Sequence, residues 1–190
     1  MAMTVRRVKD VETPRILMHK IADIRGGVSV KTSELGGDYL PEGAVLAAAV
    51  NGVCPVVKVG KVAAATSDTT LKLEKYHNFK VGDFVMAKDG GKAVTISAID
   101  ASAKKYDVLT LSAALEALEQ GAYVAEAKAA ATGSSGSKAE LKYIPQSIVG
   151  TGKVVERNSN LITDAWVIGV TANYPLPDFI ASKLKGIVNI

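Results

Sequence analysis

The stretch AVLAAAV (44–50), NG (51–52), VCPVVKV (53–59) places two apolar runs on either side of a dipeptide that favours a tight turn. Asn51 and Gly52 both tolerate the positive φ angles that a two-residue type I′ turn requires. Because such a turn joins antiparallel strands, the stretch predicts a β-hairpin over 44–59. The hairpin marks the start of a β-rich body.

Short runs with strand character continue on both sides of the hairpin. Downstream they lie at 69–73, 79–86, 94–99, 106–111 and 123–127, and the run at 79–86 is kinked at its Gly-Asp pair. Upstream, apolar and polar residues alternate over 28–32, which predicts one more short strand. A spacing of about 8–12 residues between strands is typical of all-β barrels and sandwiches.

Two short helices are predicted among these strands. Ser112 is a suitable N-cap and Gly121 a suitable C′ residue for a helix over 113–119. Asp178 is a suitable N-cap for a second helix that runs to residue 185 and ends at Gly186. Strands are predicted before it at 148–155 and 165–170, and the chain ends in an apolar GIVNI that we expect to dock on other structure.

These elements predict a mainly β fold, with a small β-barrel or sandwich as the body. We expect an extended basic N-terminal arm over 1–43 and the β-rich body over 44–131. A flexible loop or linker follows at 132–138, where the sequence is TGSSGSK. Residues 139–190 form a C-terminal β segment that ends in a short helix and packs on the body or on a neighbouring subunit.

The positive charge of the chain is concentrated near its start. Lys and Arg number 23 against 19 Asp and Glu, and the whole excess of four falls within residues 1–31. A neutral body with a basic arm differs from a nucleic-acid-binding domain, which carries its positive patch on the folded face. The arm is either a solvated leader or a segment that lies on an acidic partner. Its basic residues are Arg6, Arg7, Lys9, Arg15, Lys20, Arg25 and Lys31.

Composition excludes several classes of protein. Hydrophobic residues make up 48% of the chain, but no apolar run approaches the roughly 20 residues of a membrane helix. Acidic residues at 10 and 12 take the place of the apolar region of a signal peptide, so synthesis in the cytoplasm without a signal peptide is expected. A single cysteine excludes an internal disulfide framework.

No catalytic, metal-binding or cofactor-binding constellation is predicted. The only histidines are His19 and His77, too few for a zinc site that needs about four convergent ligands. Cys54 with His77 as base would be a nucleophilic pair, but Cys54 lies in an apolar run and is expected to be buried. No Gly-Lys pair has the spacing of a phosphate-binding loop. We therefore expect that the protein is not an enzyme.

Several blocks of the sequence carry a resemblance to a family of virion proteins. They are LPEGAVL (40–46), FKVGDFV (79–85), GAYV (121–124), TDAWVIGV (163–170), PLPDFI (175–180) and LKGI (184–187). Over roughly residues 40–190 the chain resembles phage head fiber and capsid decoration proteins, in particular those of phages and prophages of Bacteroides-type gut bacteria, including the crAss-like group. The resemblance implies a structural protein on the outer surface of the virion that forms a trimer and is attached by one end to the major capsid protein.

The resemblance supplies no binding residue, so the contacts are inferred from the residues themselves. The seven basic residues of the arm are expected to bind the capsid. An oligomer interface is expected at Trp166, Phe179, Ile180, Leu184 and Ile187. Expected partners are the major capsid protein and further copies of the chain, with another fiber or a host surface component beyond them. No contact with a membrane is expected, and none with nucleic acid.

Two other functions remain open at this stage. A small-barrel nucleic-acid-binding module would explain the basic excess, although the charge of the body is balanced. A host-glycan-binding adhesin would use Trp166 or exposed tyrosines as platforms for sugar rings. The second alternative also describes a virion protein, but one whose purpose is receptor binding.

Overall fold

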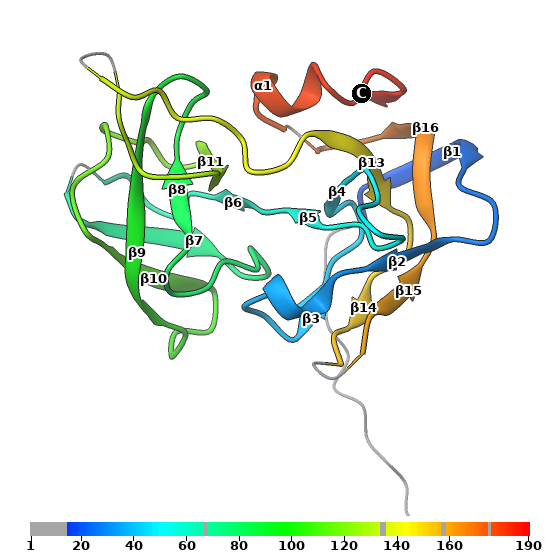
Figure 1. Ribbon diagram of the computed structural model, residues 1–190, viewed down its shortest axis with the longest axis horizontal. Coiled ribbons are helices and arrows are strands. Elements are labelled where there is room, and N and C mark those ends of the chain that lie inside the picture. Colours follow the sequence, from blue (N-terminus) through cyan, green and yellow to red (C-terminus); the bar gives the residue numbers. More distant parts are fainter. Residues whose placement is uncertain (1–14, 67, 134–135, 157–158, 175) are drawn as a thin grey trace, which may run out of the picture.

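The computed structural model describes residues 15–66, 68–133, 136–156, 159–174 and 176–190. The chain is mainly β, with 45% strand and 4% helix, as the sequence predicts. Two sheets form two lobes that lie side by side, the first on the right of Figure 1 and the second on the left. Within the described residues neither sheet closes into a barrel. No described helix is long and apolar enough to cross a membrane.

The first lobe is built from segments far apart in the sequence. The strand order of its six-stranded sheet begins β1 (Leu17–Asp23), β16 (Ala165–Thr171), β13 (Pro145–Val149), β4 (Val45–Ala47), β5 (Val56–Val57). The sixth strand, β17 (Ile187–Asn189), pairs with β16 in parallel, whereas the other pairs are antiparallel. Two small pairs complete the lobe: β2 (Val28–Val30) with β15 (Leu161–Thr163), and β3 (Tyr39–Leu40) with β14 (Lys153–Val154).

The predicted hairpin is confirmed as part of this sheet. Asn51 and Gly52 have φ angles of 52° and 78°, as a type I′ turn requires. Val50 and Val53 exchange both backbone hydrogen bonds across the turn, at 2.9 and 3.1 Å. The chain then leaves β5 and crosses directly into the second lobe.

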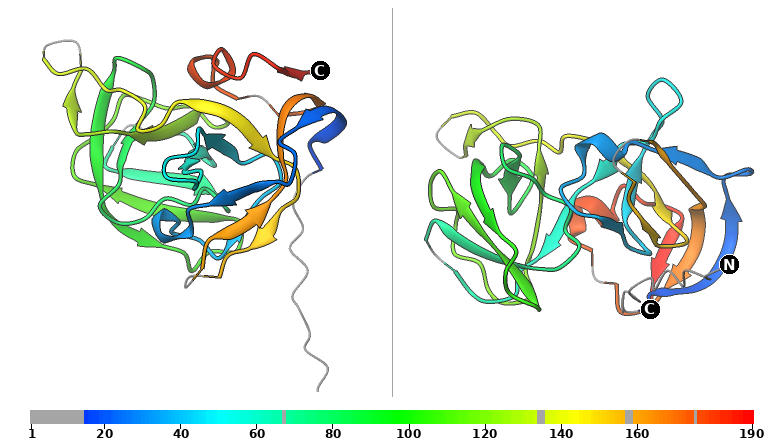
Figure 2. Two further views of the ribbon diagram at one scale, coloured as in Figure 1. Left: turned by 45° about the vertical axis from the view of Figure 1, so that its right-hand side comes forward. Right: turned by 90° about the horizontal axis from the view of Figure 1, so that it is seen from below.

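The second lobe holds a seven-stranded sheet formed by one continuous stretch of chain. Its order is β6 (Val59–Lys61), β11 (Tyr123–Ala127), β8 (Phe84–Met86), β9 (Lys92–Asp100), β10 (Tyr106–Leu111), β7 (Thr70–Glu74), and β12 (Ala131–Thr132) pairs with β9. β5 and β6 follow one another across the joint between the lobes (Figure 1). The right panel of Figure 2 shows the two lobes from below. The hairpin strands share a sheet with β13 and β16, so the predicted body over 44–131 is divided between the two lobes after β5. The chain returns to the first lobe, at β13, after the predicted linker at 132–138.

Buried apolar residues form three clusters, one of which joins the lobes. Leu71 belongs to the cluster within the second lobe, and Leu46 to a cluster within the first. The third cluster combines Met86 of the second sheet with Ile148 of the first, and Ile180 covers them from the helix α1 (Asp178–Ala181). This shared cluster is why the two sheets pack as one molecule.

The prediction of an extended arm over 1–43 is wrong for the residues that the structure describes. β1 pairs with β16 from Leu17 to Asp23, and β2, the 3-10 helix η1 (Thr32–Glu34) and β3 continue the lobe. Gly26 and Gly27, which interrupt any helical periodicity, have φ angles of 83° and 76° in the turn between β1 and β2. They allow the chain to turn from the edge strand of the six-stranded sheet into β2, which pairs with β15. Residues 1–14 of the predicted arm lie outside the described residues.

Of the two predicted helices, one does not form and the other is shorter than predicted. Residues 113–119 are not helical, because Leu118 exchanges two backbone hydrogen bonds with Thr66 and both Leu115 and Leu118 enter the core of the second lobe. A helix of seven residues has little stability of its own to set against this tertiary pairing. The helix expected from Asp178 to residue 185 extends over Asp178–Ala181 only, with Pro177 at its N-cap position and no side-chain capping bond. The apolar end that follows it docks as β17.

We predict that Gly43→Ala destabilises the protein more than Gly52→Ala. Both glycines have a φ near 79°, where a side chain costs roughly 1–2 kcal/mol. A Cβ at Gly52 would meet no atom within 4 Å, whereas one at Gly43 would collide with the Cδ1 methyl of Ile16. The expected loss of unfolding free energy is therefore about 1–2 kcal/mol for Gly52→Ala and about 1 kcal/mol more for Gly43→Ala, where the buried end of the Ile16 side chain has to move aside. Urea unfolding midpoints measure both, and equal losses would contradict the close packing at Gly43.

Candidate functional site at the joint between the lobes

Lys58 occupies the point where the chain crosses from β5 to β6, and its side chain is completely buried. Its Nζ donates to Oδ2 of Asp83 at 2.5 Å and lies 3.4 Å from Oε1 of Glu126. Asp83 directly precedes β8, and Glu126 lies in β11, so both carboxylates belong to the second lobe. A buried ammonium costs several kcal/mol unless it is paired. The position of Lys58 therefore depends on both carboxylates.

The ion pairs continue from Glu126 back to the first lobe. Oε1 of Glu126 also accepts a hydrogen bond from Nζ of Lys142 at 2.7 Å, and Lys142 lies 3.7 Å from Oε2 of Glu34. The hydroxyl of Tyr143 donates to the Glu34 carboxylate at 2.8 Å, and Lys31 pairs with it at 2.6 Å. Positive and negative groups alternate along this chain of contacts, which links η1 to β11.

Burial and pairing act in opposite directions on these groups. Burial raises the pKa of Glu126, although the charges of Lys58 and Lys142 act to lower it. At Glu34 burial also acts to raise the pKa, but the hydrogen bonds from Lys31 and Tyr143 outweigh burial, so the pKa of Glu34 is lowered. Burial, together with the hydrogen bond to Glu34, raises the pKa of Tyr143 to about 12. Tyr143 therefore stays a neutral donor to an ionised Glu34 at neutral pH.

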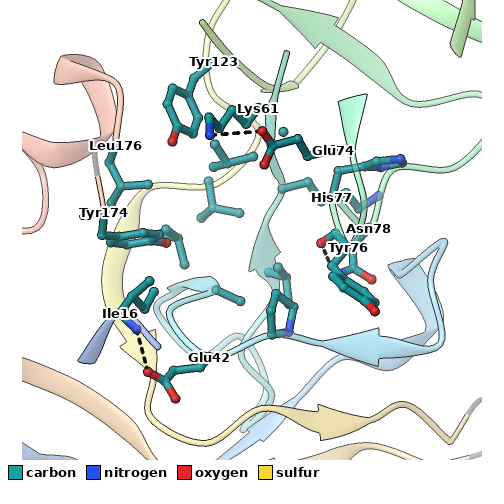
Figure 3. A pocket seen from close by; sticks show the side chains of 18 of the residues that line it. Ile16, Glu42, Lys61, Glu74, Tyr76, His77, Asn78, Tyr123, Tyr174 and Leu176 are labelled. Atoms are coloured by element: carbon teal, nitrogen blue, oxygen red, sulfur yellow. Dashed lines mark hydrogen bonds and ion pairs between the residues drawn. The ribbon is translucent and has the colours of Figure 1, made fainter. Parts of the chain in front are cut away.

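A cleft of about 240 Å³ opens beside Lys58, between the lobes. Figure 3 shows Tyr174 and Leu176 on one side of it, with Tyr76 and Asn78 facing them from the other side. The hydroxyl of Tyr174 donates to the carbonyl of Gly43, which fixes its ring against the cleft. Apart from its rim, the cleft offers mostly apolar surface, and such a recess suits an apolar group.

The polar groups at the edge of the cleft are engaged with one another or with the backbone. Nζ of Lys61 pairs with Oε1 of Glu74 at 3.0 Å, beside Tyr123 (Figure 3). Oε1 of Glu42 accepts hydrogen bonds from the backbone N–H groups of Ile16 at 3.1 Å and of the next residue at 2.9 Å. These acids hold the start of β1 and the end of β7 in place.

His77 behind the cleft has both ring nitrogens occupied. Its Nδ1 accepts a hydrogen bond from the backbone N–H of Phe79 at 3.0 Å, so the ring proton is on Nε2 and is donated to Oδ2 of Asp107 at 3.1 Å. Lys75 pairs with the other oxygen of Asp107. Burial lowers the pKa of His77, although Asp107 acts to raise it. A neutral imidazole held in this way serves to fix its loop.

The predicted oligomer-interface residues divide between core and surface. Ile180 and Leu184 are buried in the apolar cluster that joins the lobes, so this part of the prediction is wrong, because the chain covers them itself. Phe179 and Ile187 are half-buried against the same cluster. Trp166 is also half-buried, and its Nε1 donates to Oδ2 of Asp164 at 3.2 Å. The indole therefore exposes only part of its surface.

The predicted capsid-binding residues that the structure describes are all exposed on the first lobe. Arg15 and Arg25 flank the two ends of β1. Lys20 pairs with Asp23 at 2.7 Å, and Lys31 belongs to the ion pairs at Glu34. The other three, Arg6, Arg7 and Lys9, lie outside the described residues.

Cys54 is buried in the apolar cluster of the first lobe, as expected, and burial raises the pKa of its thiol. The part of the chain that the structure describes holds no group of three or more His, Cys, Asp or Glu side chains that could bind a metal ion. Sequence reasoning missed Lys58, Asp83 and Glu126. The available signal was a charged residue inside each of two apolar strands, VCPVVKV and YVAEA.

We predict that Lys58→Met destabilises the protein by about 3–5 kcal/mol, because it leaves two buried carboxylates without their shared cation. Lys88→Met is the matched control, since it breaks an exposed pair with Glu116 and is expected to cost at most about 1 kcal/mol. Guanidinium unfolding measures both. A Lys58→Met protein as stable as the control variant would show that the buried cation is dispensable.

We predict that His77 makes stability depend on pH. A histidine whose pKa is lowered by folding contributes stability above its ordinary value of 6.5, and this contribution is lost as the pH falls below it. The unfolding free energy should therefore decrease between about pH 7.5 and 5.5, by at most about 1.4 kcal/mol per pH unit for one proton. His77→Gln should flatten this dependence, whereas the exposed His19→Gln should keep it. An equal slope in both variants would assign the effect to other groups.

Comparison with known proteins assigns the chain to no family. The chain matches no protein-family model, no curated protein and no solved structure. Its function is therefore argued from its own residues.

Proposed function

We propose that the protein is a virion structural protein, a head fiber or decoration protein that attaches to the outer surface of a phage capsid through the major capsid protein. In this proposal three copies assemble through the first lobe. The proposal rests on the resemblance of residues 40–190 to head fiber proteins and on one observation of the surface.

The observation that carries the proposal is an exposed apolar set on neighbouring strands at the β1 end of the first lobe's sheet. Three neighbouring strands, β1, β16 and β17, contribute it. We call this set the outer face; its members are Met18, Ile21, Ile168 and Val188 on these strands and Ile190, which directly follows β17. Large apolar side chains gathered on paired strands at a surface are typical of contacts with another protein.

Irregularities in β1 support this interpretation. The pairing of β1 with β16 shifts register between Leu17 and His19 and again between Lys20 and Ala22. Met18 and Ile21 are the residues skipped at these two shifts, and both are exposed. Bulges of this kind protect a sheet edge from indiscriminate pairing and redirect side chains. In β1 they direct apolar side chains outward.

The outer face replaces the predicted interface as the proposed contact between copies. Val188 is opposite Val170 in the pairing of β17 with β16, so both side chains lie on one face of the sheet. Ile168 is two residues from Val170 on the same strand and shares that face. Arg15 and Arg25, at the two ends of β1, are then left for contact with an acidic capsid surface.

We predict that the purified protein has a mass near three times 19.8 kDa by light scattering and that it co-sediments with capsids. The capsids are assembled from the major capsid protein of a crAss-like phage. Val188→Asp should give the mass of a single chain, because it places a charge in the contact. Arg15→Ser combined with Arg25→Ser should keep the trimer but lose co-sedimentation, and the difference from wild type should be largest at low salt, where the charges are least screened.

Ile144→Asp is the matched control, because Ile144 is exposed outside the outer face. It should leave both the mass and the co-sedimentation unchanged. Deletion of residues 2–31 is unsuitable as a test, since it would remove β1 and β2 from the fold. A wild-type protein that is monomeric and stays in the supernatant would overturn the proposal.

A further inference from the structure

A second cavity, of about 440 Å³, shares Lys75–Asn78 with the cleft between the lobes. We call it the loop cavity. Its other walls come from the loop at 36–38, from residues 79–81, and from Ile99, Ala101 and Asp107 around the β9–β10 connection. Its volume falls within the roughly 300–1,000 Å³ that small-molecule sites occupy. Figure 3 shows Tyr76, His77 and Asn78 from the side of the cleft.

The shared segment is held in a strained conformation. Tyr76 and Asn78 have φ angles of 70° and 60°, in the left-handed region that a tyrosine rarely adopts. Nδ2 of Asn78 donates to the carbonyls of Tyr76 at 3.2 Å and Tyr39 at 3.3 Å, while His77 anchors the segment to Asp107. Strain of about 1–3 kcal/mol per residue persists only where the surroundings impose it, and it concentrates at functional sites.

Two apolar side chains of the loop cavity face solvent, one of them on the strained segment. The side chains of Tyr76 and Val81 both line the loop cavity and are 37% and 58% exposed. The ring of Tyr39 supports that of Tyr76 edge-on, with 5.5 Å between ring centroids and 63° between planes. The two exposed side chains can therefore contact the C–H face of a ligand.

The charged side chains of the loop cavity balance one another. Lys75 pairs with Asp107, and the other cation and anion are Lys80 and Asp38. Nζ of Lys80 also donates to the carbonyl of Ser33 at 3.3 Å, which leaves its other N–H groups for a ligand. With two of each sign the cavity gives no advantage to an anion or to a cation. Ammonium groups donate hydrogen bonds and carboxylates accept them, so the cavity can satisfy both halves of a hydroxyl group.

A buried acceptor adds to this polar set. Asn78 is 4% exposed, and its Oδ1 has no hydrogen-bond partner in the described part of the chain. An orphaned acceptor of this kind costs roughly 1–3 kcal/mol, so it favours a donor that can reach it. A Cβ at Gly37 would stand 2.8 Å from this oxygen, and glycine leaves that space unfilled.

We propose that the loop cavity binds a neutral saccharide unit. A sugar ring combines a C–H face with hydroxyl groups that both donate and accept hydrogen bonds, which matches an apolar wall beside balanced polar groups. The assignment goes beyond attachment to a capsid. It also places recognition at Tyr76 and Val81, away from Trp166.

The test begins with the full chain, labelled and applied to a printed array of host and bacterial glycans. Glucose, galactose and N-acetylglucosamine are then titrated separately into the ¹⁵N-labelled protein. We expect array binding, and saccharide-dependent shifts of the backbone amides at 36–38 and 75–81. Inorganic phosphate and acetate are the charged comparison ligands, and neither should reproduce these shifts.

Variants at two walls make the test specific. Tyr76→Gly removes the ring while a φ of 70° suits glycine, so the fold should be kept and affinity should fall at least tenfold. Tyr76→Phe keeps the ring and should retain binding. Val81→Ser should weaken binding, whereas its matched control Val154→Ser should not, because Val154 is 53% exposed on β14, outside the cavity.

Three results would overturn the proposal. The first is an array without bound glycans together with unshifted amides. The second is binding that survives Tyr76→Gly unchanged, which would place the saccharide elsewhere. The third is a stronger response to phosphate or acetate than to any sugar, which would make the cavity an anion site. Because none of these measurements uses capsids or the oligomeric mass, they are independent of the proposed virion role.

Discussion

The ammonium group of Lys58, buried between Asp83 and Glu126, is the constraint on which the joint between the two lobes depends. The chain crosses between the sheets at this residue, so its backbone cannot move without separating charges in a low-dielectric interior. Glu126 also pairs with Lys142, which in turn pairs with Glu34 of the first lobe, so the ion pairs connect the two lobes. The shared apolar cluster packs the lobes against each other, and the ion pairs fix the relative position of the residues that they join.

Both cavities depend on this joint. The cleft lies beside Lys58, and the segment Lys75–Asn78 lines both the cleft and the loop cavity. Asp83 accepts hydrogen bonds from Lys58 and from the backbone N–H of Lys80, so the ion pair also positions the loop that carries the cavity wall. His77 and Asp107 hold the segment from behind. The strained segment that presents Tyr76 is thus held by His77 within the second lobe and by Asn78, which donates to the carbonyl of Tyr39 in the first.

The surface divides into regions of different chemistry. The outer face and the arginines that flank β1 belong to the first lobe, where they suit contact with other protein surfaces. The loop cavity is formed mainly by loops of the second lobe and has balanced charge. In the proposed virion role, the first lobe would hold the assembly together and the second would face outward. Assembly and recognition would then use separate parts of one small chain.

Local sequence determined the elements whose signals are local. Asn51-Gly52 specified the hairpin turn, and short runs with strand character predicted β7, β9, β10, β11 and β16, because turn geometry and strand propensity are encoded by adjacent residues. Tertiary structure decided the rest. The segment at 113–119 does not form a helix, because its backbone pairs with Thr66, which is distant in sequence. β1 pairs with β16, which lies far along the chain. The sequence marks Lys58 and Glu126 as charged residues within apolar strands, but it does not show that they pair. Lys58, Asp83 and Glu126 form ion pairs only because the fold buries them within reach of one another.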